Sequence, residues 1–372
     1  MSPTTADETY PTPPVGRVVA VDALRGLVMA CIMAGDGLHR AVLEASKLAL
    51  GRVPAGLAHQ LEHPRWEGFS TWDMIMPLFL FVVGVAMPYS MAGRGGDGRG
   101  ATYGRALRRA GVLWVLGMIA QGNLLEFRLD RLRLYSNTLQ AIAAGYLIAT
   151  VALVELRRSW RLSAAVAGLL LTYWGCISIV PPPGRFDPGA NFALRVDRLA
   201  LGRFRDGTTY TWVLGSLGFG ASVLIGVLAG RLLRSGLSGP RKVAWLVGSG
   251  LILLAAGRAW SPWMPIIKHM WTGSMVLWAG GWSLILLGLF HGIIDVLGFR
   301  GWTYPLTVIG ANAIVAYMAD PLLDMRHIGQ RLLGGLCVHL GAAAELGVAC
   351  GTWGLLWLAL WFLYKHRIFV RV

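Results

Sequence analysis

Residues that could carry out acid-base chemistry gather in one polar segment near the N-terminus. In chain order the segment contains His39, His59, Glu62, His63, Arg65, Trp66 and Glu67, and the apolar run that follows opens with Ser70, Thr71, Trp72 and Asp73. Histidine takes up and returns a proton near neutral pH, and a neighbouring carboxylate can orient its ring. His63 is therefore a candidate general base, although a histidine in a polar loop usually has no catalytic role.

The same histidines could instead bind a metal ion. His59 and His63 are four residues apart, as two ligands on one helix face would be. Pro54 and Pro64 argue against one long helix that carries both histidines. The four cysteines are widely separated and show no CxxC spacing. We therefore expect no metal site.

The composition places this segment in a membrane protein. Of the 372 residues 55% are hydrophobic and 14% are charged, and the mean hydropathy is +0.56, which excludes a soluble globule. A net charge of +15 and a pI near 10.3 would also suit a nucleic-acid-binding protein. In so apolar a chain, basic loops at the cytoplasmic face explain that charge better. We expect membrane lipids, and no nucleic acid, as partners.

Runs without charge, long enough to cross the hydrocarbon core, predict the helices. Nine such runs cover residues 74–93, 110–125, 134–154, 162–184, 207–230, 243–257, 269–294, 301–319 and 346–364. A tenth, residues 18–38, carries Asp22 and Arg25 in its first turns and Asp36 at its far end. The runs are continuous rather than alternating, which favours helices over a barrel. The sequence thus predicts an all-α integral membrane protein with about ten transmembrane helices.

Loop charge predicts the orientation of these helices. The segments on one side are short and densely basic, whereas those on the other are longer and hold most of the acidic residues. Because the positive-inside rule applies to short loops, we expect both termini inside. Residues 1–16 then form a flexible cytoplasmic tail, and residues 17–372 form a single transmembrane domain. Its outer loops are residues 37–70, 181–206 and 321–345.

Charged residues at membrane depth are candidates for function because they are costly to bury. Asp22 and Arg25 could form an ion pair at the start of their helix, or they could line the mouth of an internal cavity. Asp36, at the far end of that helix, reads by itself as a solvated carboxylate.

Three motifs in order resemble the heparan-alpha-glucosaminide N-acetyltransferase family. They are VDALRG at 21–26, HPRWEGFSTWD at 63–73 and PLFLFVVG at 77–84. Further apparent landmarks are Leu139-Gln140 with Tyr146, Asp197-Arg198-Leu199, Gly226 to Gly230, Lys268 with Trp271-Thr272, Asp295, Gly310-Ala311-Asn312 with Tyr317, and Tyr364 with Ile368-Phe369. The resemblance covers nearly the whole chain after residue 17.

The resemblance implies a multi-span acyltransferase, and we expect a bacterial-type member in the cytoplasmic (inner) membrane. It implies that acetyl passes from cytosolic acetyl-CoA to a sugar or glycan acceptor on the opposite face, with His63 as the catalytic residue. The Asn that assists the family histidine corresponds here to Asp36. This chain also has Ala141 where the family often has Arg, and Thr209-Tyr210-Thr211 where it often has Asp-Pro-Glu.

A mechanism follows from the resemblance. His63 would act as general base or as an acetyl carrier, with Asp36 or Asp73 orienting its ring. We expect the acceptor to contact Trp66 and Glu67, where Trp66 could instead belong to an interfacial aromatic belt. The acetyl-CoA path would be lined by Arg25, Gln140, Asn312 and Tyr317, although the last three could simply hydrogen-bond between helices.

Several alternatives stay open at this point. The acceptor could be an amine or a hydroxyl. The oligomeric state is not defined by the sequence, with a homodimer as one option. A second class of function, a polytopic transporter or exporter of a polar solute, also suits ten spans with charges at membrane depth. Inverted halves with matching broken helices would indicate a transporter, and the sequence shows none.

Overall fold

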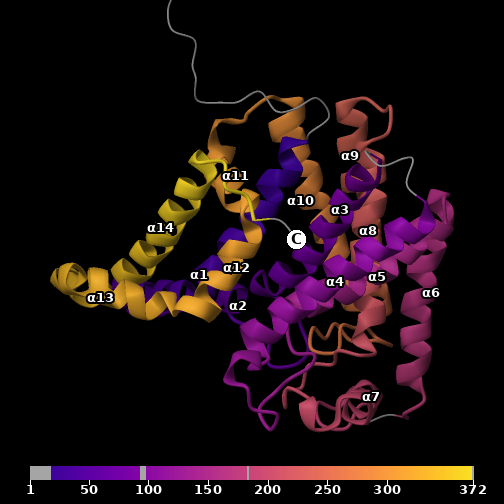
Figure 1. Ribbon diagram of the computed structural model, residues 1–372, viewed down its shortest axis with the longest axis horizontal. Helices are drawn as coiled ribbons and strands as arrows, with labels where there is room; N and C mark the ends of the chain where they lie inside the picture. The colour runs from indigo at the N-terminus through magenta and orange to yellow at the C-terminus, as the bar shows by residue number, and fades with distance from the viewer. Residues whose placement is uncertain (1–17, 93–97, 182–183, 371–372) are drawn as a thin grey trace, which may run out of the picture.

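The computed structural model describes residues 18–92, 98–181 and 184–370, so the predicted tail at 1–16 lies outside the described residues (Figure 1). Within these ranges the chain forms helices and no strand, apart from one isolated bridge between Tyr135 and Arg205. The all-α prediction is confirmed. The α-helices are α1 (Val19–Leu50), α2 (Ala55–Leu61), α3 (Ile75–Ala92), α4 (Arg99–Gln121), α5 (Thr138–Glu155), α6 (Ser159–Ser178), α7 (Phe192–Leu201), α8 (Gly215–Leu233), α9 (Gly239–Trp260), α10 (Gly273–Phe290), α11 (Tyr304–Ala311), α12 (Ala313–Leu323), α13 (Met325–Cys337) and α14 (Ala344–Lys365).

Seven helical segments of the described residues are long and apolar enough to cross a membrane. They contain α3, α5, α6, α8, α9, α10 and α14. The run predicted at 301–319 is not one straight helix, because α11 and α12 meet at 61° around Asn312 and make an eighth span only as a pair. The runs at 18–38 and 110–125 overlap the longer helices α1 and α4, whose first turns are charged, and the second run extends past the end of α4 at Gln121.

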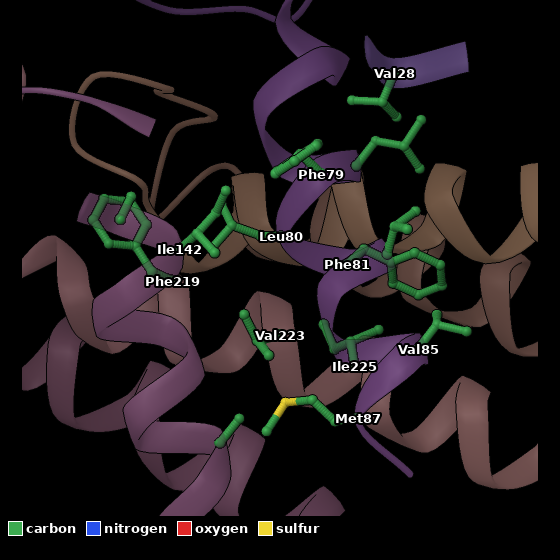
Figure 2. Close-up of a cluster of buried hydrophobic side chains, with 14 of the residues drawn as sticks. Val28, Phe79, Leu80, Phe81, Val85, Met87, Ile142, Phe219, Val223 and Ile225 are labelled. Carbon is green, nitrogen blue, oxygen red and sulfur yellow. The ribbon is translucent and has the colours of Figure 1, made fainter. Parts of the chain in front are cut away.

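The centre of the bundle is the contact between α3 and α8. A Cβ atom on Gly226 would overlap the Phe81 carbonyl oxygen, and one on Gly84 would overlap the Val223 carbonyl oxygen. The backbones therefore approach each other where neither helix has a side chain, as small residues permit in membranes. Large apolar side chains of both helices, among them Phe79 and Phe219, surround the contact (Figure 2).

Polar contacts gather the helix ends on one side of the bundle, here called the basic end. Arg234 donates to the Pro88 carbonyl, Arg231 donates to the Arg157 carbonyl, and Arg99 pairs with Glu155 at 3.1 Å. The end of α3, the start of α4 and the ends of α5 and α8 thus lie together. The start of α1 joins the π-helical turn His291–Val296 that follows α10, because the Ala20 amide donates to Asp295.

The opposite side, here called the loop end, is formed by the segments 62–74, 202–214 and 261–272. The Gly68 amide donates to the Ile266 carbonyl, and the Thr211 amide donates to the His269 carbonyl. Arg133 donates to the Asp206 carbonyl, which ties the α4–α5 connection to the same place. Three stretches far apart in the sequence therefore meet at this end.

The predicted outer loops contain much helix. Residues 37–70 include the second part of α1 and all of α2, residues 181–206 include α7, and residues 321–345 include α13. Within α1 the helix bends at Gly35, whose φ of 49° is easily adopted only by glycine. The last two helices, α13 and α14, pack on each other and extend to one side of the molecule (Figure 1).

Candidate active site

The loop that carries His63 is fixed at both of its ends. α2 ends at Leu61, so His59 and His63 do not share one helix, as the flanking prolines predicted. Further along, Gly68 has a φ of 123° while its amide hydrogen-bonds to the 261–272 segment. A residue with a side chain would be strained at this φ. The loop therefore turns back towards the start of α3, where Asp73 lies.

Asp73 is a buried carboxylate at the entrance of α3. It lies in the short helix η1 (Trp72–Met74) and is 1% exposed. Its Oδ2 atom accepts from the Ser70 amide at 3.0 Å and from the Ser70 hydroxyl at 3.2 Å. These bonds hold the carboxylate in a single orientation and leave Oδ1 available to other partners.

His63 hydrogen-bonds to Oδ1 of Asp73. The distance from His63 Nδ1 to Asp73 Oδ1 is 2.6 Å, and the histidine side chain is 44% exposed while the aspartate side chain is 2% exposed. A carboxylate is an acceptor, so Nδ1 carries a proton, and in the neutral imidazole Nε2 then has the lone pair. This arrangement, an orienting carboxylate behind an accessible imidazole, is the one that general-base catalysis uses.

Lys268 completes the cluster from the other side of the chain. Its Nζ atom lies 3.1 Å from Asp73 Oδ1 and 3.5 Å from His63 Nδ1, although it is 205 residues away from His63 in the sequence. Burial lowers the pKa of Lys268, and the Asp73 carboxylate opposes that shift. The buried negative charge of Asp73 is thereby balanced. Sequence reasoning noted Lys268 only as a landmark of the resemblance.

His269 lies next to this cluster and contacts the rings of Tyr210 and Trp66. Its Nδ1 lies 2.6 Å from Thr209 Oγ1, and its ring stacks on Tyr210 with 4.0 Å between centroids and meets Trp66 edge-on at 5.5 Å. Burial, with a further contribution from the Lys268 charge, lowers the pKa of His269 to about 4. The ring is therefore neutral at pH 7. Nothing in the sequence pointed to His269, because its partners come from distant segments.

Comparison with known proteins gives distant but extended similarity. The chain is 23% identical to mouse heparan-alpha-glucosaminide N-acetyltransferase over 379 aligned positions, which cover 84% of this chain and 56% of the relative. The human protein of the same name is 21% identical over 374 positions with the same coverage. The chain is similar to heparan-alpha-glucosaminide N-acetyltransferase. The resemblance inferred from the motifs is thus confirmed along most of the chain.

No family profile matches the chain. The chain also spans little more than half the length of the curated heparan-alpha-glucosaminide N-acetyltransferases, because 56% of each is covered.

The predicted acceptor residues occupy the same loop as His63. Trp66 is half-buried, and its indole nitrogen donates to the Phe186 carbonyl at 2.9 Å, which fixes the ring beside His269. Glu67, next to it, is exposed. In a distant segment, Asp197 of α7 accepts from the amides of Trp212 and Val213 at 2.7 and 2.9 Å. This bond anchors the segment that presents Tyr210 to the His269 ring.

The residues predicted to line the donor path have other, local contacts. Gln140 is fully buried and bonds to the backbone of Leu134 and Ser136. Asn312, at the break between α11 and α12, donates to the Ile368 carbonyl and accepts from the Val370 amide at 2.9 Å. The amide of Asn312 therefore holds the C-terminal segment against the bent pair.

The remaining predicted site residues lie on α1 and α12. Arg25 pairs with Asp22 at 2.9 Å within α1, as the spacing predicted for an ion pair. Tyr317 of α12 packs against the main hydrophobic core. Residue 36 follows the bend of α1, and the side chain of Asp36 lies outside what the structure describes. In the described part of the chain, no group of three or more metal-binding side chains is assembled.

Proposed function

We propose that this chain is a transmembrane acetyltransferase that moves acetyl from acetyl-CoA to an amine or hydroxyl of a sugar or glycan. The observation that carries the proposal is the exposed His63 imidazole, held at 2.6 Å by the buried Asp73 carboxylate. It stands in a chain similar to proteins named N-acetyltransferases. An accessible base suits direct attack by an external acceptor.

The reaction needs one proton to be moved. The acceptor nitrogen or oxygen attacks the thioester carbonyl carbon, a C–N or C–O bond forms, and the C–S bond breaks. His63 Nε2 takes the proton of the attacking group and passes it to the departing CoA thiolate, so the histidine ends the cycle neutral. The same neutral Nε2 could first accept the acetyl group itself, which is the alternative route through an acetyl-histidine.

Asp73 and Lys268 act through His63 in this mechanism. Asp73 holds the Nδ1 proton and stabilises the imidazolium that forms during attack. Lys268, 3.1 Å from Asp73, offsets the cost of a buried carboxylate. Without a cation there, the carboxylate would bind a proton more readily and would orient His63 less well.

The charge of the basic end and of the loop end supports an orientation of the protein in the membrane. We propose ten spans: the seven apolar segments, the bent pair of α11 and α12, and the helices α1 and α4. Both termini would lie on the cytoplasmic side of a bacterial inner membrane. What supports this is that the segments at the basic end are short and densely basic, whereas His63 and Trp66 lie in the longer, mixed-charge segments of the loop end. Phosphates of acetyl-CoA would meet the basic end, because guanidinium groups bind phosphate well.

Donor and acceptor would then approach from opposite sides. The acetyl arm would pass the predicted donor residues Arg25, Gln140, Asn312 and Tyr317. The acceptor would meet Trp66 and Glu67, and Tyr210 and His269 offer further ring faces against which a sugar could pack. Asp36 remains a proposed partner of His63 from α1.

The direct test is acetyl transfer by protein reconstituted in nanodiscs. Labelled acetyl-CoA is supplied with glucosamine, and His63→Ala is compared with His59→Ala, a matched change at an exposed histidine of the preceding helix. We expect His63→Ala to lose transfer by at least about 10³-fold and His59→Ala to keep it. Normal turnover by folded His63→Ala protein would refute the proposal.

A further inference from the structure

An apolar groove runs along the outside of the bundle. It has a volume of about 570 Å³ and is lined by residues of α6, α8, α9 and α10. α6 packs along α8, and α9 packs along α10, so the groove lies between the two peripheral helices. Its lining is apolar apart from Ser163 and Ser249. All four helices belong to the segments able to span a membrane, so the groove lies at the depth of lipid chains.

The groove runs along one face of α6 towards the loop end. Ala167, Leu170 and Leu171 line it, and Trp174 and Ser178 continue the same face at helical spacing. The Trp174 indole nitrogen and the Ser178 hydroxyl are buried and have no hydrogen-bond partner among the described residues. A buried donor without a partner is costly, so a polar group that could pair with it is expected beside this face.

The groove is continuous with the candidate active site. Trp260, the last residue of α9, lines the groove and meets Trp174 edge-on at 6.0 Å. Trp66 packs against the same buried cluster as these two tryptophans. The cluster consists of Tyr173, Ile177, Ala193, Met264, Ile267 and Met270. Trp260 also begins the connection to α10 that carries Lys268 and His269. The apolar groove therefore ends where the proposed acceptor site begins.

We infer that the acceptor is lipid-linked: its hydrocarbon chain lies in the groove, and its sugar reaches His63 past Trp260 and Trp66. This inference rests on the proposed function and names its substrate class. A chain in the groove would hold the headgroup at the membrane surface, next to the unpaired donors of Trp174 and Ser178. Burial of each methylene contributes to binding, so even part of a long chain anchors the sugar.

The test compares two acceptors that differ only in their tails, hexadecyl β-glucosaminide and methyl β-glucosaminide. Ala167→Trp fills the groove from α6, and Ile252→Trp fills it from α9. Ala164→Trp is the matched control, because Ala164 is an exposed alanine of α6 outside the groove. All proteins are assayed in phosphatidylcholine nanodiscs, so partitioning of the long acceptor into the bilayer is the same for each variant.

We expect both groove variants to raise KM for the hexadecyl acceptor by about tenfold, which corresponds to losing burial of about two methylenes. KM for the methyl acceptor should not change, and Ala164→Trp should resemble the wild type with both acceptors. Equal KM values in groove variants and control, or equal losses with both acceptors, would overturn the inference.

A second measurement separates this inference from the proposed function. Native mass spectrometry without acetyl-CoA should show hexadecyl β-glucosaminide retained by wild type and Ala164→Trp, but not by Ala167→Trp. That result supports the groove even if neither acceptor is acetylated, an outcome that would refute only the acetyltransferase proposal. Displacement of the glucosaminide by an equal amount of phosphatidylglycerol would instead identify a general lipid site and overturn the inference.

Discussion

Lys268 Nζ lies 3.1 Å from Asp73 Oδ1, the carboxylate oxygen that also faces His63 Nδ1. Two cationic or proton-donating groups thus share one buried acceptor, and the side chains of Lys268 and Asp73 are 11% and 2% exposed. In such a buried pair, removal of one partner leaves the other charge uncompensated. The geometry of the histidine therefore depends on a lysine from a distant loop.

Replacement of Lys268 should change the pH dependence of the reaction. In Lys268→Met the Asp73 carboxylate loses a cation that lowers its pKa, so it binds a proton more readily and the acidic limb of the pH–rate profile should move to higher pH. At pH 7 the rate should fall by about 10- to 100-fold. Lys268→Arg should restore much of the loss. Lys242→Met, a lysine of the basic end that binds the Leu233 carbonyl, is the control and should leave the profile unchanged.

Asp73→Asn should separate geometry from charge. The substitution keeps the size of the side chain but offers His63 a neutral amide, so the Nδ1 tautomer is no longer enforced. We expect kcat to fall by about 10²- to 10⁴-fold while KM for the acceptor changes little. Steady-state kinetics with labelled acetyl-CoA measure both values. A rise in KM with normal kcat would instead assign Asp73 to acceptor binding.

The depressed pKa of His269 predicts acid sensitivity of the loop end. Burial favours the neutral ring in the folded protein, where its pKa is about 4, whereas an unfolded histidine titrates near 6.5. The stabilisation is present above pH 6.5 and is lost as the pH falls towards 4, because the unfolded chain then binds the extra proton. Its size is on the order of 1 kcal/mol after allowance for partial exposure.

His269→Asn should therefore lose less thermal stability than the wild type between pH 7.5 and pH 5. Scanning fluorimetry of detergent-solubilised protein measures the two melting temperatures. His339→Asn, at an exposed histidine, serves as the control and should behave like the wild type. Identical pH dependence in His269→Asn and wild type would show that another group is responsible.

The close contact of α3 and α8 predicts contrasting effects of two glycine substitutions. A methyl group at Gly226 would overlap the Phe81 carbonyl, so Gly226→Ala should destabilise the protein by about 1–3 kcal/mol or more. Gly248 of α9 has no neighbour within 4 Å of an added Cβ. Gly248→Ala should be neutral or stabilise by up to about 1 kcal/mol, because alanine favours the helix. Thermal melting of the two variants provides the comparison.

Part of the candidate site could be predicted from local sequence. His63, Trp66 and Asp73 lie within eleven consecutive residues whose types suggest acid-base chemistry, and the structure brings His63 and Asp73 together. Two carboxylates, Asp36 and Asp73, were equal candidates for orienting the ring. The choice could not be made from sequence, because it depends on how the loop turns back at Gly68.

The sequence by itself determined that the chain is an all-α membrane protein, because a long uncharged run can satisfy its backbone in hydrocarbon only as a helix. It also located the polar segment with His63. Only the tertiary structure decided that Lys268 and His269 join that segment, and that the run at 301–319 breaks at Asn312. Hydropathy is a property of neighbouring residues, whereas the pairing of a buried charge depends on which distant segments the packed helices bring to the same end.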